Sequence, residues 1–214
     1  MTIETPVYLR RSVDTAVDKT VLLPELPPGF AYPDHYEVTV ELPGVGPLIV
    51  RPIRKDDAPL FEALFKSLTP RSVYLRFFTI LRQLPPAMLA RFTQIDYAHE
   101  IALVALIDDN GLQTMVGDAR VIETGEAGGA EFSVMVKDPW QGKGIGACLL
   151  HHCLAISQRR GYRHVHGIVL PDNRQMLALG RKLGFTIRRE PSGAEFKLSK
   201  AFDEDTMDHT GGGS

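Results

Sequence analysis

The stretch Gln141-Gly142-Lys143-Gly144-Ile145-Gly146 decides how this chain is interpreted, because of the segments on either side of it. Residues 131–137 are rich in apolar side chains and predict a β-strand, and residues 147–160 carry apolar residues at helical spacing. A glycine loop between a strand and the start of a helix makes a cradle for an anion. Successive backbone N–H groups point to one place, and the helix dipole adds about half a positive charge there. Because glycine has no Cβ, a phosphate can approach the backbone closely, so the loop predicts a phosphate-bearing ligand.

Length and composition favour one folded domain in a reducing compartment. A chain of 214 residues with 44% hydrophobic content can bury one good core. It has no apolar run of the ~18 residues that a membrane-spanning helix needs, and residues 1–12 lack the apolar middle of a signal peptide. Cys148 and Cys153 lie on different sides of one predicted helix, so no disulfide is expected. We expect a cytoplasmic protein with no membrane partner.

The charge of the chain is unevenly distributed. Residues 35–200 carry 21 Lys and Arg against 17 Asp and Glu, whereas residues 1–34 carry 3 against 5 and residues 201–214 carry none against 4. The central part is therefore mildly basic and both ends are acidic. This excess is far too small for a nucleic-acid-binding surface, and it suits one polyanionic small ligand. We expect no nucleic-acid partner.

Proline, glycine and apolar periodicity divide the chain into three parts. Residues 1–34 are interpreted as a proline-rich arm or linker, residues 35–200 as the folded domain, and residues 201–214 as a disordered, acidic, glycine-rich tail. Apolar patterns in the domain predict strands over residues 36–42, 48–53, 101–107, 113–123, 131–137, 164–170, 185–189 and 194–198. Helical spacing predicts helices near residues 57–68, 69–78, 86–92, 147–160 and 173–183.

Two other phosphate-binding motifs have to be weighed. Gly142, Gly144 and Ala147 fit the dinucleotide-binding pattern G-x-G-x-x-A. The context fits poorly, because residues 138–141 separate the predicted strand from the first glycine and no acidic residue ends the next strand, over residues 164–170. A P-loop is excluded, because no Gly-Lys-Ser/Thr sequence is present at the loop. A dinucleotide site is the less favoured alternative.

The order Gln141-x-x-Gly144-x-Gly146, late in the chain and after antiparallel strands, resembles the coenzyme A pyrophosphate loop of the GNAT superfamily of N-acetyltransferases. The likeness covers residues 48–198. It implies an α/β fold, with a mixed and mostly antiparallel sheet of six to seven strands flanked by helices. Within the superfamily the chain is most similar to bacterial protein lysine acetyltransferases of the Pat type. The stretches that carry this closer likeness are residues 74–78, 89–105, 130–132 and 170–185.

The GNAT resemblance implies acetyl-CoA as co-substrate and assigns residues to it. The pyrophosphate would be held by Gln141, Gly142, Lys143, Gly144, Ile145, Gly146 and Ala147, with Lys143 adding a charged contact. The pantetheine arm would lie along the preceding strand, against the backbone of Val134, Met135 and Val136, where an N–H group would hold the thioester oxygen. Asn173 matches the position whose side chain steadies that arm. Its role as a helix N-cap is equally sound on physical grounds.

Glu131 is the candidate general base. It is a carboxylate at the start of an apolar strand, where partial burial would raise its pKa toward the range for accepting a proton from an ammonium group. Pat-type enzymes carry a glutamate in this setting as their proposed base. The alternative is an edge-strand glutamate that faces water. Many GNAT enzymes also have a tyrosine, four residues before the glycine of a Gly-Phe pair, that protonates the leaving thiolate; here that position is Gly180, so water could serve.

Two further clusters have simple structural explanations. Cys148 and His152 have the i, i+4 spacing of metal ligands, but no third or fourth ligand is evident near them, so no metal site is expected. Tyr74, Phe77 and Phe78 either line an acceptor pocket or belong to the core, where aromatic residues at helical spacing are usually found.

Together these features predict an acetyl-CoA-dependent N-acetyltransferase in which an amine attacks the thioester directly. The Pat resemblance points to a protein lysine as acceptor, such as a lysine of an acyl-CoA synthetase. A small-molecule amine is the alternative acceptor. A non-catalytic module that binds acetyl-CoA and reports it to a partner is the alternative from another class. Neither the acceptor nor the oligomeric state follows from the sequence.

Overall fold

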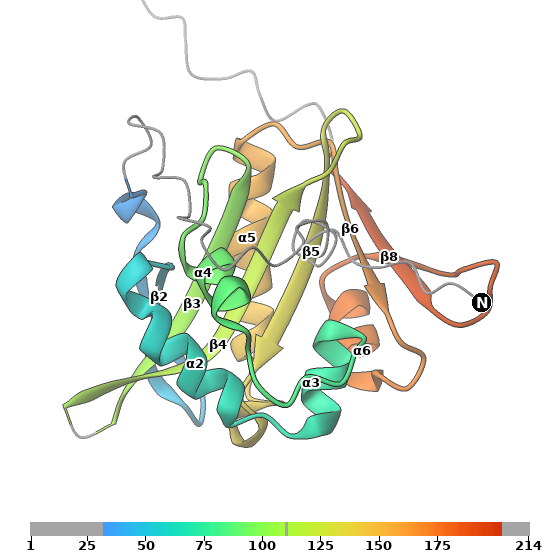
Figure 1. The fold of residues 1–214 in the computed structure, drawn as a ribbon. Helices are drawn as coiled ribbons and strands as arrows, with labels where there is room; N and C mark the ends of the chain where they lie inside the picture. The colour runs from blue at the N-terminus through green and yellow to red at the C-terminus, as the bar shows by residue number, and fades with distance from the viewer. Residues whose placement is uncertain (1–31, 110, 203–214) are drawn as a thin grey trace, which may run out of the picture.

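A computed structural model describes residues 32–109 and 111–202 of the chain, so most of the expected arm and tail lie outside the described residues. The described residues contain one sheet of eight strands in the order β1-β2-β3-β4-β5-β6-β8-β7 (Figure 1). The strands are β1 (Val38–Leu42), β2 (Gly46–Pro52), β3 (Glu100–Asp109), β4 (Leu112–Glu123), β5 (Gly129–Val136), β6 (His164–Val169), β7 (Thr186–Arg189) and β8 (Phe196–Ala201).

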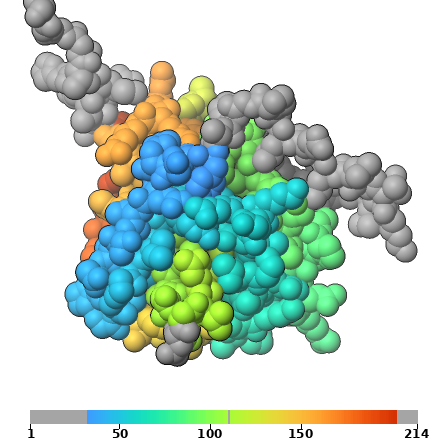
Figure 2. Space-filling model, turned by 90° about the vertical axis from the view of Figure 1, so that its left-hand side faces the viewer, coloured from blue at the N-terminus to red at the C-terminus, as the bar shows by residue number. Residues whose placement is uncertain are grey.

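The mixed, mostly antiparallel sheet is confirmed. Neighbouring strands pair antiparallel except for β5 and β6, which pair parallel. The sheet has eight strands where six to seven were expected, because the first hairpin, β1–β2, and the last hairpin, β7–β8, both join it. Figure 2 shows the side of the molecule away from α6, where β1 and β2 lie beside α2.

Helices cover both faces of the sheet (Figure 1). They are α2 (Ala58–Lys66), α3 (Pro70–Phe77), α4 (Pro86–Thr93), α5 (Ile145–Arg159) and α6 (Arg174–Lys182), with short 3-10 turns η1 (Asp34–Tyr36), η2 (Lys55–Asp57) and η3 (Asp138–Trp140). Residues of α5 and α6 share one apolar core with the sheet, and residues of α2, α3 and α4 share a second. In the part of the chain that the structure describes, no helix is both long enough and apolar enough to cross a membrane.

The side chains of β5 alternate between these two cores. Phe132 belongs to the core of α5 and α6, whereas Met135 belongs to the core of α2, α3 and α4. Glu131 pairs in register with Ile122 of β4, which also lies in the core of α2, α3 and α4. Because strand side chains alternate with a period of two, Glu131, Ser133 and Met135 share the face toward α3.

The face toward α2, α3 and α4 also carries a buried ion cluster centred on Arg120, which is fully buried. Its guanidinium donates to Asp118 (Nε to Oδ1, 2.8 Å), to Glu100 (Nη1 to Oε1, 3.1 Å) and to the carbonyl oxygen of Phe92 (Nη2 to O, 2.7 Å). A buried charge is stable only when it is paired and hydrogen-bonded, so this cluster ties β3, β4 and α4 into one arrangement.

The parallel pairing of β5 with β6 is short, and this creates the site. It runs only from Gly129 opposite His164 to Glu131 opposite His166. Beyond that point β5 stays paired with β4 as far as Val136, while β6 continues alongside β8. The two strands therefore diverge, and the edge of β5 after Glu131 is not paired with β6.

Candidate active site

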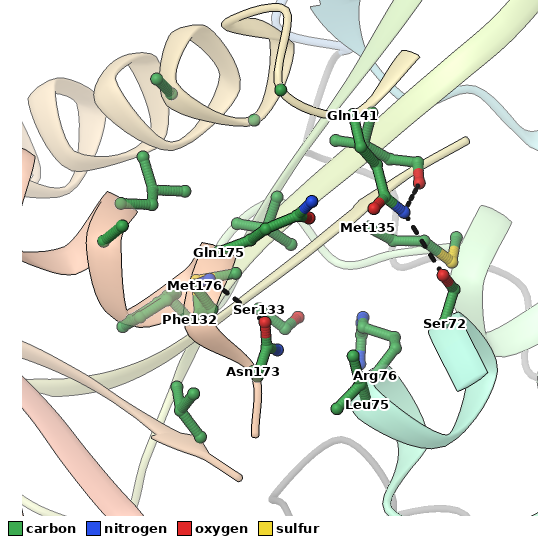
Figure 3. Close-up of a pocket in the computed structure, with 18 of the residues that line it drawn as sticks. Ser72, Leu75, Arg76, Phe132, Ser133, Met135, Gln141, Asn173, Gln175 and Met176 are labelled. Atoms are coloured by element: carbon green, nitrogen blue, oxygen red, sulfur yellow. Dashed lines mark hydrogen bonds between the residues drawn. The ribbon is translucent and has the colours of Figure 1, made fainter. Parts of the chain in front are cut away.

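A cavity of about 440 Å³ lies where β5 and β6 diverge. Its walls come from β5 with the following glycine loop, from α3, and from α6 (Figure 3). Ten of the twelve residues assigned to the site from the sequence line this cavity: Glu131, Val134, Met135, Val136, Gln141, Gly142, Gly144, Gly146, Ala147 and Asn173. The sequence thus identified the strand-and-loop wall of one continuous cavity.

The glycine loop adopts backbone conformations that favour glycine. Gly142 has φ +74° and Gly144 has φ +90°, in the left-handed region that is costly for residues with a Cβ. α5 begins directly after Gly144, which has no side chain to cap the first-turn N–H groups. Those donors and the positive end of the helix dipole are therefore available to an anionic ligand in the cavity.

Gly146 has a different reason to be glycine. A Cβ built on it would lie 3.5 Å from Val134 Cγ1 and 3.5 Å from Val136 Cγ2, which are ordinary van der Waals contacts, and its φ is not positive. The protein itself would accept alanine at this position. Since Gly146 lines the cavity, the missing Cβ leaves space for a ligand to approach the first turn of α5.

The side chain of Gln141 joins two walls of the cavity. Its amide Nε2 donates to the carbonyl oxygen of Val136 (3.0 Å) and to Ser72 Oγ on α3 (3.3 Å). Figure 3 shows the amide between β5 and α3. Gln141 therefore holds the loop entrance against α3 while it lines the cavity.

Asp138 extends this connection. Its carboxylate accepts from Ser72 Oγ (2.6 Å), from the backbone N–H of Thr69 (2.9 Å) and from Thr69 Oγ1 (3.1 Å). Burial acts to raise the pKa of Asp138, but the hydrogen bonds from Ser72 and Thr69 outweigh it and hold the pKa below its ordinary value. Asp138 thus fixes the start of α3 to the turn that leads into the glycine loop.

Asn173 occupies the end of α6 nearest the cavity. Its Oδ1 accepts from the backbone N–H of Met176 (3.1 Å), so the side chain caps α6 as expected. The amide nitrogen lies on the side of the cavity toward Arg76 (Figure 3). The capping role and a ligand-facing role are therefore compatible, because they use different atoms of one amide.

Glu131 lines the cavity and is the last residue of β5 that pairs with β6. Its side chain is on the face of β5 toward α3, and the residue is 7% exposed, so the prediction of partial burial fits and a water-facing edge glutamate does not. In the pairing of β5 with β6 it lies opposite His166. Sequence reasoning did not single out His166, because only the sheet order brings it beside Glu131.

Two residues expected to bind cofactor are not among those that line the cavity. Lys143 places its Nζ 5.4 Å from the centre of the Trp140 ring, and Trp140 in turn lines the cavity. Ile145 has its side chain buried in the core beneath α5. Because the Ile145 side chain points into the core, only its backbone N–H could contact a ligand at the start of α5.

Sequence reasoning missed most of the wall formed by α3. Ser72, Leu75 and Arg76 line the cavity from this helix, and Arg76 is only 6% exposed. An arginine between Leu75 and Phe77 in an apolar stretch is a signal that could have been noticed. α6 contributes Gln175, Met176 and Lys182, whose helical spacing gives no hint of a site.

The aromatic residues of α3 have three different environments. Phe77 is fully buried in the core, which was one of the two roles considered for these aromatic residues. Tyr74 is 39% exposed. Phe78 lines the cavity with φ +57°, and it is the one residue other than glycine with a positive φ among residues 32–109 and 111–202. An aromatic residue in this conformation is uncommon, and its place at the cavity wall matches the tendency of such residues to lie at functional sites.

The structure shows why a tyrosine is absent at position 180. A Cβ on Gly180 would lie 2.4 Å from Leu198 Cδ2 of β8, and Leu198 is fully buried. Position 180 therefore faces the packed core between α6 and the sheet. Within the described residues, no group of three or more His, Cys, Asp or Glu side chains is arranged to hold a metal ion.

Comparisons with known proteins agree with this geometry. The sequence model of the acetyltransferase (GNAT) family matches residues 69–185. The chain is 31% identical to the acetyltransferase PA5475 of Pseudomonas aeruginosa over 144 residues, which are 67% of this chain and 77% of that protein. It is 30% identical to the acetyltransferase Pat of Mycolicibacterium smegmatis over 123 residues, 57% of this chain but only 36% of that protein. The crystal structure of the GNAT domain of S. lividans PAT superposes with a TM-score of 0.73 at 29% identity, over 80% of this chain and 100% of that one.

Proposed function

Because the chain belongs to the GNAT family of acetyltransferases, we propose that it transfers an acetyl group from acetyl-CoA to the side-chain amine of a protein lysine. One observation carries the proposal. The glycine loop at the start of α5 and the edge of β5 that is not paired with β6 lie along one cavity. An anion site continuous with an open strand edge suits a ligand with a phosphate head and an amide-containing arm.

Each part of acetyl-CoA can be assigned to residues of the cavity. The loop from Gln141 to Ala147 would receive the pyrophosphate at the helix start, where Gly146 leaves room for it. The backbone of Val134 and Val136 would pair with the amides of the pantetheine arm as a further strand would. The Asn173 amide nitrogen would steady the arm from the opposite wall.

The chemistry needs a deprotonated amine and a stabilised oxyanion. When bound, acetyl-CoA supplies an activated acyl carbon. Glu131 accepts a proton from the acceptor ammonium, directly or through water; the neutral amine then forms its bond to that carbon, and the nitrogen releases its second proton to solvent. A backbone N–H on the unpaired edge of β5 donates to the oxygen on which negative charge develops. The carbon–sulfur bond then breaks, and we assign protonation of the leaving thiolate to water, because position 180 offers no side chain.

Two similarities support a protein acceptor. The acetyltransferase Pat of M. smegmatis and the GNAT domain of S. lividans PAT both resemble this chain in sequence. The acceptor we propose is a lysine of a cytoplasmic enzyme such as an acyl-CoA synthetase. The chain spans about a third of the length of M. smegmatis Pat, so this part of the proposal concerns the catalytic domain alone.

The proposal is tested by measuring CoA release from acetyl-CoA with wild-type protein and with Glu131→Gln. Each is offered a lysine-bearing acyl-CoA synthetase and, separately, a panel of small amines. We expect release with the protein acceptor and a loss of ~100-fold in kcat/KM for Glu131→Gln, the lower range for a general base. Acetyl-CoA affinity should stay unchanged. Glu62→Gln is the control, because Glu62 is an exposed partner of Lys66 on α2.

Other outcomes separate the alternatives. Turnover confined to small amines would keep the acetyltransferase activity and discard the protein acceptor. Tight binding of acetyl-CoA without release for any acceptor would contradict the catalytic proposal and favour a sensor. Equal kcat/KM for wild type and Glu131→Gln would remove Glu131 as the base.

A further inference from the structure

Lys182 is a cation at one end of the cavity that the proposed acyl transfer does not use. It lies in the last turn of α6, is exposed, and lines the cavity together with Gln175, Ala178 and Leu179. These four residues have the spacing i, i+3, i+4 and i+7, so they share one face of the helix. α6 therefore presents one face to the cavity, and Lys182 is the charged member of the four.

Two contacts fix the direction in which α6 runs along the cavity. Just before the start of the helix, Asp172 pairs with Arg71 of α3 (Oδ2 to Nη2, 3.1 Å). Further along, Leu179 faces the first turn of α5, because a Cβ built on Gly146 would lie 3.8 Å from Leu179 Cδ2. Lys182 comes three residues after Leu179, about 4.5 Å further along the helix axis. It therefore lies at the glycine-loop end of the cavity.

The usual structural role of a cation at this position is already filled by another residue. Lysine and arginine near the C-terminus of a helix are favoured by the negative end of its dipole. In α6 this end is met by Lys200 of β8, whose Nζ donates to the carbonyl oxygen of Leu183 (3.0 Å). The backbone also closes the helix, because the N–H of Phe185 donates to the carbonyl oxygen of Gly180 (2.9 Å). The end of α6 is thus held without the side chain of Lys182.

Lys182 has no ion-pair partner among residues 32–109 and 111–202. The neighbouring glycine loop attracts an anion through the N–H groups and the dipole of α5. A lysine ammonium adds a full positive charge on a flexible stem, which suits a second phosphate close to the first. This end of the cavity therefore has two positive sites, one made of backbone at the start of α5 and one made of a side chain on α6.

Coenzyme A carries phosphate at two neighbouring places, the pyrophosphate and the 3′ position of the ribose. We propose that Lys182 binds the ribose 3′-phosphate, so that the enzyme discriminates CoA and its esters from their 3′-dephospho counterparts. The inference rests on the proposed use of acetyl-CoA, with its pyrophosphate at the glycine loop. No bond forms or breaks at the 3′-phosphate, so Lys182 contributes to affinity and not to the chemical step.

The test is a direct binding measurement that does not depend on turnover. Isothermal titration calorimetry gives the dissociation constants of CoA and of 3′-dephospho-CoA for wild type, Lys182→Met and Lys182→Arg. The ratio of the two constants is compared within each protein, so an inactive fraction of the preparation does not affect it. Arg181→Met is the matched control, because Arg181 is an exposed cation in the same turn of α6 that is not among the residues lining the cavity.

We expect wild type to bind CoA roughly five- to thirtyfold more tightly than 3′-dephospho-CoA, between the values for an exposed ion pair and for a hydrogen bond to a charged group. Lys182→Met should remove most of this preference by weakening the binding of CoA alone. Lys182→Arg should keep most of it, because the charge is kept. Arg181→Met should keep all of it. The preference of wild type should fall as salt is raised, since an exposed charge is screened.

Four results would overturn the inference in distinguishable ways. A preference for CoA that Lys182→Met leaves unchanged and Lys143→Met removes would place the 3′-phosphate near Trp140 and keep the proposed function. Equal losses in Lys182→Met and Arg181→Met would indicate long-range attraction in place of a contact. Equal binding of CoA and 3′-dephospho-CoA by wild type would show that the ribose phosphate lies in solvent. No binding of either compound would contradict the proposed function as well.

Discussion

The two sides of the cavity are built from different kinds of chemical group. β5 and the glycine loop offer mainly backbone: the edge of a strand that diverges from β6, and the N–H groups at the start of α5. α3 and α6 offer side chains, including the guanidinium of Arg76 and the amide of Asn173. Backbone groups are the same in every member of a fold, whereas side chains can change singly.

This difference assigns different tasks to the two sides. A wall of backbone donors suits the part of a ligand that never varies, and a wall of side chains suits the part that does. In the proposed function, the first wall meets the pyrophosphate and the arm of acetyl-CoA, and the second meets the acyl group and the acceptor. Substitutions on each side should therefore have effects of different kinds.

The largest expected effects come from substitutions at position 180 of α6 and at its neighbour Leu198, beginning with a tyrosine at position 180. A Cβ there would already lie 2.4 Å from Leu198 Cδ2, so Gly180→Tyr should lower the free energy of unfolding by about 1–3 kcal/mol or more through overpacking. Urea denaturation measures the loss. The variant should not gain turnover, because the side chain would be directed at β8.

A second substitution makes this prediction specific. Leu198→Ala alone should destabilise the protein by about 2–5 kcal/mol, because it opens a cavity in the core. Combined with Gly180→Tyr, it should cost less than the two single losses added together, since the removed side chain makes room for the new one. A Gly180→Tyr variant as stable as wild type, with raised turnover, would show instead that position 180 faces the ligand.

The sequence predicted the backbone wall much better than the side-chain wall, and the reason is physical. The loop from Gln141 to Gly146 needs glycine at Gly142 (φ +74°) and Gly144 (φ +90°), so its conformation can be recognised from the glycines in the sequence. No sequence pattern shows that the edge of β5 is open, but the resemblance to GNAT proteins predicted that a ligand would lie along this strand. Arg76 gives only a weak signal, because α3 carries a second arginine, the exposed Arg71, and an arginine on a helix has many structural explanations.

The other features that the sequence did not predict depend on how strands pair and how side chains pack in the folded protein. His166 lies opposite Glu131 only because β6 pairs with β5 after a helical crossover. Lys143 was assigned to the ligand from its place in the loop; its Nζ lies over the Trp140 ring, which lines the cavity, so its contact with a pyrophosphate stays a prediction. The apolar patterns predicted all eight strands, but the GNAT resemblance implied a sheet of six to seven, because sequence patterns do not show whether a terminal hairpin joins the main sheet.

A paired substitution in the glycine loop separates folding from binding on the backbone wall. Gly144→Ala should lower the free energy of unfolding by about 1 kcal/mol, because φ +90° is strained for any residue with a Cβ. Gly146→Ala should leave stability unchanged or raise it by up to ~1 kcal/mol, since alanine favours the helix and its Cβ meets only ordinary contacts.

The readout that matters for Gly146→Ala is the KM for acetyl-CoA. It should rise by roughly tenfold, because the new methyl group occupies space at the helix start where the pyrophosphate would lie. Thermal unfolding and steady-state kinetics on both variants provide the measurement. An unchanged KM in stably folded Gly146→Ala would place the pyrophosphate elsewhere.

The smallest expected effect concerns Asp138, which links the two walls through Ser72 and Thr69. Because these hydrogen bonds hold the pKa of Asp138 below its ordinary value of 3.8, the carboxylate stabilises the folded state at neutral pH. That contribution is fully present above the unfolded-state pKa and is lost as the pH falls through the lowered folded-state pKa. Asp138 is partly exposed, so we expect Asp138→Asn to cost about 1 kcal/mol or less at pH 7.

The pH dependence of this cost decides whether the link is electrostatic. Urea denaturation at pH 7 should show wild type as the more stable protein, and the difference between wild type and Asp138→Asn should shrink as the pH is lowered below about 4, the ordinary aspartate range. A difference that is the same at pH 7 and in acid would mean that asparagine disturbs the packing of the turn and that the ionised carboxylate contributes nothing of its own. In that case the hydrogen bond between Gln141 and Ser72 would be the contact that joins the glycine loop to α3. Ser72→Ala should then lower the free energy of unfolding as much as Asp138→Asn does.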